Sequence, residues 1–170
     1  MPAAAQSFDF SIDLPLRNEW KNVERLRTSV ASQLTAVLGE GPTGDAVSLV
    51  AAELAENAIK YCHWDDTATT LRVRIWSEDG HALVSVENPV VPGQGCPAAL
   101  REAIDYIRRY PTAEDAYRAK LLTIAATPQA GRSGLGLVRL AYEARCRLRA
   151  ELDADRLRVV ADLDIPPRAA

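Results

Sequence analysis

The sequence of 170 residues predicts an α+β two-layer sandwich, in which helices cover one face of a mixed or antiparallel β-sheet. Strand-like alternation of apolar and polar residues, with a period of two, occurs at 8–14, 71–76, 82–88, 146–150 and 157–163. Segments with helical periodicity lie between these strands in blocks, and turn signals join neighbouring strands into hairpins. This arrangement excludes the strict strand–helix alternation of a doubly wound fold.

Composition limits the class of protein further. Apolar residues make up 48% and charged residues 25% of the chain, which is typical of a globular protein, and the length suits a single domain spanning 1–170 with its core at about 8–165. The net charge of −3 argues against a nucleic-acid partner. Three widely spaced cysteines fit a reducing cytoplasm better than a disulfide framework, and no apolar run is long enough for a membrane span.

The first third of the chain predicts one strand and two helices. Residues 8–14 alternate and form a half-buried strand that ends at a proline. Apolar residues then recur every three or four positions over 23–37, which predicts a long amphipathic helix ending at Gly39. Residues 43–45 are expected to form a loop and a cap, and residues 50–61 form the next helix, because they contain strong helix formers and no proline or glycine.

A hairpin follows this second helix. Asp79 and Gly80 are a turn signal between the alternating segments 71–76 and 82–88. The inward-facing row of the second segment is apolar until Asn88, which places a polar amide at the carboxyl end of the strand.

Helices are expected at 98–109, 112–126 and 135–145. Thr112 and Asp115 have the spacing of a capping box at the start of one of them. The chain then closes with a second hairpin that turns near residues 153–155.

The helix at 50–61 carries an unusual polar stripe. Glu53, Asn57 and Lys60 recur at i, i+4 and i+7 beside an apolar stripe formed by Val50, Leu54, Ala58 and Tyr61. A carboxylate and an amide can hold or orient a hydrated Mg²⁺, and a lysine one turn later can meet phosphate oxygens. An ordinary solvated helix face is the alternative explanation of the same pattern.

A glycine-rich segment, Gly131-Arg-Ser-Gly-Leu-Gly-Leu137, precedes the helix at 135–145. Glycines allow the backbone N–H groups to approach a ligand closely, and the start of the helix favours an anion such as phosphate. Arg132 and Ser133 would add a cation and a hydroxyl. The spacing is not that of a Walker loop, and a tight helix entry is the alternative explanation.

Together these two segments resemble motifs of the GHKL superfamily, which includes gyrase, Hsp90, histidine kinases and MutL. Glu53-x-x-x-Asn57-x-x-Lys60-Tyr61 is similar to its N-box, and the segment 131–137 is similar to its second glycine box. The resemblance covers roughly residues 8–165 and is greatest to the free-standing anti-sigma-factor serine kinases of bacterial partner-switching systems. It implies a Bergerat-type ATP-binding fold with ATP and Mg²⁺ as ligands.

The resemblance also implies roles for individual residues. Glu53 would be the base that orients or deprotonates the attacking hydroxyl or water, Asn57 would ligate Mg²⁺, and Lys60 would help to hold the phosphates. The phosphates would lie against Arg132, Ser133, Gly134, Leu135 and Gly136.

The part of the predicted pocket that would bind adenine departs from the family pattern. Asn88 stands where the family has an aspartate that accepts the adenine amino proton, and Val90 stands where it has a glycine. Asn88 keeps a carbonyl acceptor but has no charge. Losing the charge-assisted hydrogen bond to adenine would cost about 1–2 kcal/mol of binding free energy.

Two functions follow. The first is a cytoplasmic serine/threonine protein kinase that phosphorylates a small regulatory protein, STAS-like or sigma-factor-like, with a homodimer implied by the resemblance. The second is a non-catalytic adaptor of the same fold that acts through protein contacts alone.

Two further segments have alternative interpretations. Arginines 145, 147, 149, 156 and 158 are explained by cross-strand charge pairs or by a docking patch for an acidic partner. The helices within 98–126 are either a lid over the nucleotide or an insertion that packs as core.

Overall fold

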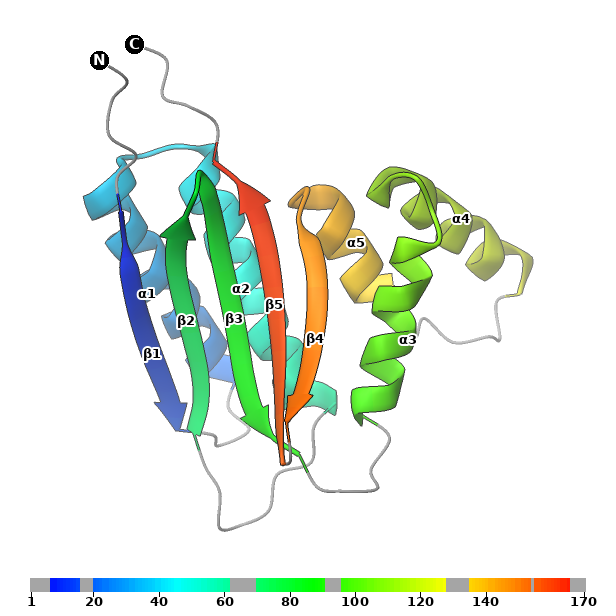
Figure 1. Ribbon diagram of the computed structural model, residues 1–170, viewed down its shortest axis with the longest axis horizontal. Coiled ribbons are helices and arrows are strands. Elements are labelled where there is room, and N and C mark those ends of the chain that lie inside the picture. Colours follow the sequence, from blue (N-terminus) through cyan, green and yellow to red (C-terminus); the bar gives the residue numbers. More distant parts are fainter. Residues whose placement is uncertain are drawn as a thin grey trace.

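The structure is a computed structural model that describes residues 7–15, 20–61, 70–90, 96–127, 135–153 and 155–165. Five strands and five helices lie in these residues (Figure 1). In chain order they are β1 (Asp9–Pro15), α1 (Trp20–Leu38), α2 (Pro42–Tyr61), β2 (Thr70–Glu78), β3 (His81–Pro89), α3 (Cys96–Arg108), α4 (Ala113–Ala126), α5 (Leu135–Glu143), β4 (Arg147–Asp153) and β5 (Arg156–Asp164). The predicted α+β class is confirmed.

The strands form one open sheet in the order β1-β2-β3-β5-β4. All neighbouring strands pair antiparallel, so the sheet is antiparallel rather than mixed. The predicted hairpin between β2 and β3 is present: Asp79 and Gly80 have φ of 48° and 82°. Two successive residues with positive φ match the right-handed twist of the flanking strands, which explains why Asp-Gly occupies this turn.

Helices cover one face of the sheet (Figure 1). α1 and α2 pack against each other, and α2 contacts β2, β3 and β5. α3 contacts the edge strand β4, and the guanidinium Nη2 of Arg108 donates to the carbonyl of Leu148 at 3.3 Å. A side-chain donor on an edge carbonyl satisfies a group that an edge strand otherwise exposes. α4 packs on α5 beyond this edge, where Tyr117 and Tyr142 stack with their ring centroids 5.1 Å apart.

The core lies between the helices and the inner face of the sheet. It combines alternate strand residues with the apolar faces of α1 and α2, as their periodicities predict. The fully buried side chains in it include Leu26, Val30, Leu34, Val47, Val50, Leu71, Val73, Ile75, Val84 and Val86.

α2 is longer than expected at its amino end. Residues 43–45 lie in the first turn of the helix and not in a loop, because α2 begins at Pro42. Proline suits a first helical position, and Asp45 in the first turn complements the helix dipole. A Cβ added to Gly44 would lie 3.7 Å from Cβ of Leu34, so the glycine stands where α1 and α2 approach each other.

The other face of the sheet carries ordered charge pairs. Arg72 pairs with Asp13, Arg74 with Asp9, Arg147 with Asp162 and Asp164, and both Arg156 and Arg158 with Glu87. These residues lie opposite or diagonal to one another on adjacent strands. The cross-strand explanation of the arginines at 147, 156 and 158 therefore fits the structure, whereas Arg145 has a φ of 50° in the turn before β4.

Among the helices in these described ranges, none has both the length and the apolar character needed to cross a bilayer.

The ion pairs of Glu87 make the stability of the folded protein depend on pH. Hydrogen bonds from Arg158, with a further contribution from Arg156, hold the pKa of Glu87 below its usual value of 4.5 although desolvation raises it. The unfolded chain therefore takes up the proton first as the pH falls. The stabilisation is complete above the unfolded pKa and is lost as the pH falls through the folded pKa. We expect the free energy of unfolding in urea to decrease between about pH 6 and about pH 3.

The Glu87→Gln variant should lose less unfolding free energy over this pH range than the wild type. At neutral pH it should be less stable than the wild type. The matched control is Glu114→Gln, because Glu114 pairs with Arg118 on an exposed helix face. An acid dependence in Glu87→Gln equal to that of the wild type would contradict the assignment.

Candidate functional site

The carboxyl ends of α2 and β3 lie toward the lower end of the molecule in Figure 1, and α5 begins higher, at about the middle of the view. These three element ends carry the described residues that the sequence singled out. Leu135 and Gly136 begin α5, whereas Arg132, Ser133 and Gly134 lie outside the described residues. The site can therefore be built from α2, β3 and the first turns of α5.

Glu53 and Asn57 share one face of α2, because they are four residues apart. The adjacent face carries Val50 and Leu54, which are buried in the core and fix the rotation of the helix. The side chain of Glu53 is 24% exposed, and Asn57 is half-buried. The polar stripe is therefore a partly enclosed surface and not a freely solvated face.

Asn57 has an unsatisfied amide. Its Nδ2 is buried and has no hydrogen-bond partner among the residues that the structure describes. A buried donor of this kind costs about 1–3 kcal/mol, and native structures contain few of them. A ligand that supplies an acceptor would remove this cost.

Asn57 faces the start of α5. A Cβ built on Gly136 would lie 4.0 Å from Oδ1 of Asn57. An alanine would therefore just meet the amide, and a larger side chain would occupy the space in front of it. The absence of a side chain at Gly136 keeps this face of Asn57 accessible.

A second contact joins the same two helices one turn away. Nη2 of Arg139 donates to Oε1 of Glu53 at 3.3 Å. Since Asn57 follows Glu53 in α2 while Gly136 precedes Arg139 in α5, the two helices run antiparallel along these contacts (Figure 1). Sequence reasoning did not find Arg139; the only signal was its position three residues after Gly136.

Lys60 continues the stripe two turns after Glu53, at the exposed end of α2. It forms an ion pair with Glu56, one turn earlier, and its side chain is 41% exposed. A pair between exposed residues at i and i+4 contributes only about 0.3–0.5 kcal/mol.

Asn88 ends the inward row of β3, as predicted. It is 1% exposed, and its Nδ2 donates to the carbonyl of Pro89 at 3.0 Å. The side-chain oxygen is then the group of Asn88 that can accept a hydrogen bond from a ligand. The next residue, Val90, donates its N–H to the carbonyl of Asp155 at 2.7 Å and packs its side chain against the core.

Other reactive groups do not add to this site. Burial raises the pKa of the Cys146 thiol to about 12, so it stays protonated and is not a nucleophile. In the described part of the chain, no group of three His, Cys, Asp or Glu side chains is placed to hold a metal ion. A Mg²⁺ here would depend on Asn57, water and the phosphates of a nucleotide, which is the usual way this ion binds with a nucleotide.

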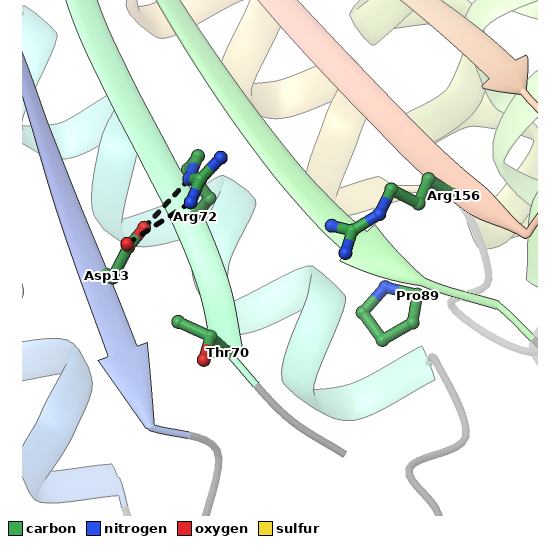
Figure 2. Close-up of a pocket in the computed structure, with 5 residues that line it drawn as sticks. All are labelled: Asp13, Thr70, Arg72, Pro89 and Arg156. Atoms are coloured by element: carbon green, nitrogen blue, oxygen red, sulfur yellow. Dashed lines mark hydrogen bonds and ion pairs between the residues drawn. The ribbon is translucent and has the colours of Figure 1, made fainter.

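A cavity of about 200 Å³ lies on the opposite face of the sheet (Figure 2). It is lined by Asp13, Thr70, Arg72, Pro89 and Arg156. Both guanidinium groups already have carboxylate partners: Nε of Arg72 is 2.9 Å from Oδ1 of Asp13, and Nη1 of Arg156 is 2.9 Å from Oε1 of Glu87. The polar groups at the end of α2 belong to a different surface, on the helical side of the sheet.

A scan against known protein families finds no match, and a search of curated proteins finds no significant match.

Proposed function

We propose that this chain is an ATP-binding regulatory protein with a Bergerat-type GHKL fold, and that it acts as a serine/threonine protein kinase on a small regulatory protein. The observation that carries the proposal is the buried, unpartnered amide of Asn57 facing Gly136 at the start of α5. The side-chain oxygen of Asn57 would ligate Mg²⁺, and a phosphate oxygen would accept from its Nδ2. Mg²⁺ held there would supply positive charge that neutralises the charge developing during transfer.

The chain's own residues have separate tasks in this proposal. Glu53 accepts the proton of the attacking serine or threonine hydroxyl. The N–H groups at the start of α5 donate to the phosphates, as the free N–H groups of a helix start can. Asn88 accepts from the adenine amine through its side-chain oxygen. Lys60 leaves Glu56 for a phosphate oxygen.

A second function is favoured by the structure around Val90. Val90 packs against the core at a position where the family pattern has glycine. The inward row of β3 ends in Asn88, where the family pattern has an aspartate. A pocket that cannot admit adenine would leave a non-catalytic adaptor that acts through protein contacts. Such an adaptor would bind its partner equally well with and without nucleotide.

The test is incubation with γ-labelled ATP, Mg²⁺ and a small acceptor protein encoded beside this chain. The kinase proposal expects label on a serine or threonine of the acceptor, and no label when Mg²⁺ is removed with a chelator. Complex formation with the acceptor in the absence of any label would support the adaptor instead.

A further inference from the structure

We propose that Arg139 is a positioning residue for Glu53, so that its guanidinium orients the carboxylate for proton transfer. The inference rests on the proposed function and adds a residue that the sequence motifs do not contain.

Arg139 joins two carboxylates from different helices. Its Nη2 is 3.3 Å from Oε1 of Glu53 on α2, and its Nε is 3.8 Å from Oε2 of Glu143, one turn later on α5. The side chains of Arg139 and Glu143 are 45% and 48% exposed, whereas that of Glu53 is only 24% exposed. The guanidinium of Arg139 therefore lies between the two carboxylates and bridges α5 to α2.

The contact uses one oxygen of Glu53. Arg139 donates to Oε1, and among the described residues no hydrogen bond to Oε2 is formed. A carboxylate held through one oxygen presents the other in a defined direction. A general base has to be held within about 0.5 Å of its productive geometry, and a long flexible glutamate does not hold that position without support.

The proton balance assigns distinct parts to the two residues. The substrate hydroxyl gives its proton to Oε2 of Glu53 as its oxygen bonds to the γ-phosphorus. The bond from that phosphorus to the bridging oxygen breaks, and ADP leaves with the electron pair. Arg139 gives up no proton, and its guanidinium is engaged by the carboxylates of Glu53 and Glu143. Its effect should therefore be on turnover and not on nucleotide affinity.

The experiment compares Arg139→Gln and Arg139→Lys with the wild type in three measurements: kcat for phosphate transfer, Kd for Mg-ATP by calorimetry, and the melting temperature. We expect Arg139→Gln to lower kcat about 10- to 100-fold, the size of effect that misplacing a reacting group produces. Kd and the melting temperature should stay close to the wild-type values, and Arg139→Lys should recover part of the lost rate. Arg118→Gln is the matched control, because it removes an exposed ion pair with Glu114 on α4 and should leave all three values unchanged.

Several results would overturn the inference. Wild-type or increased kcat in Arg139→Gln would show that the contact does not assist transfer. A parallel loss of kcat and of Mg-ATP affinity would show that Arg139 holds the nucleotide. A wild-type protein that does not bind Mg-ATP would instead reject the proposed function, and the positioning role with it.

Discussion

Replacing Asn57 with leucine is expected to raise the stability of the ligand-free protein and to abolish its response to Mg-ATP. Leucine has nearly the shape of asparagine but no buried donor, so the cost of the unpartnered Nδ2 disappears. Removing an unsatisfied donor of this kind should increase the free energy of unfolding in urea by about 1 kcal/mol. A residue that only supported the fold would not be improved by this change.

The same variant reports on the ligand. Mg-ATP at about 100 times its Kd should stabilise the wild type by about 2.7 kcal/mol, seen as a higher melting temperature. Asn57→Leu should not respond, because it has lost the proposed Mg²⁺ ligand.

The matched control is Ser48→Ala, which changes a buried polar residue of the same helix. The Ser48 hydroxyl already donates to the carbonyl of Gly44 at 2.8 Å, so its loss should bring no gain in stability and should leave the Mg-ATP response intact. If Asn57→Leu is less stable than the wild type and still responds to Mg-ATP, the assignment of Asn57 is wrong.

Glu53→Gln is expected to lower phosphate transfer about 10²- to 10⁴-fold, which is the usual contribution of a general base. Glutamine keeps the shape of the side chain and an oxygen for Arg139, but it cannot take the hydroxyl proton. The affinity for Mg-ATP, measured by calorimetry, should therefore stay within about twofold, since the metal ligand and the start of α5 are unchanged.

Glu24→Gln on the exposed face of α1 is the matched control and should transfer phosphate at the wild-type rate. Wild-type transfer by Glu53→Gln would exclude Glu53 as the base. A loss of binding in this variant would assign Glu53 to the nucleotide or the metal instead.

The strands and the inward position of Asn88 were predictable because they depend on local alternation. Each strand has one face against the helices, so period-two patterning determines which side chains face the helices. It does not account for Leu83, Ser85 and Val160, which are buried on the other face of the two central strands. The same logic gave the stripe of Glu53 and Asn57, since helical spacing determines which residues share a face. The start of α2 was not predictable in this way, because Thr43 and Gly44 have weak helix propensity and their helical conformation follows from Pro42 and from the packing of α1 on α2.

The contacts between α2 and α5 could not be predicted from the sequence. Arg139 and Glu53 are 86 residues apart, and their pairing depends on how α5 lies along α2. The unsatisfied amide of Asn57 has the same origin, because burial of one atom follows from the tertiary packing and not from spacing. The choice between a nucleotide lid and a packed insertion for α3 and α4 stays a prediction, although α3 contacts β4 and α4 contacts α5.

The most direct test of the central claim is a calorimetric titration of the wild-type protein with Mg-ATP, repeated with Asn57→Leu. The proposed site predicts saturable binding with a micromolar Kd for the wild type and no measurable binding for a variant that is folded and at least as stable. No binding by the wild type at millimolar Mg-ATP, or equal binding by the two proteins, would contradict it.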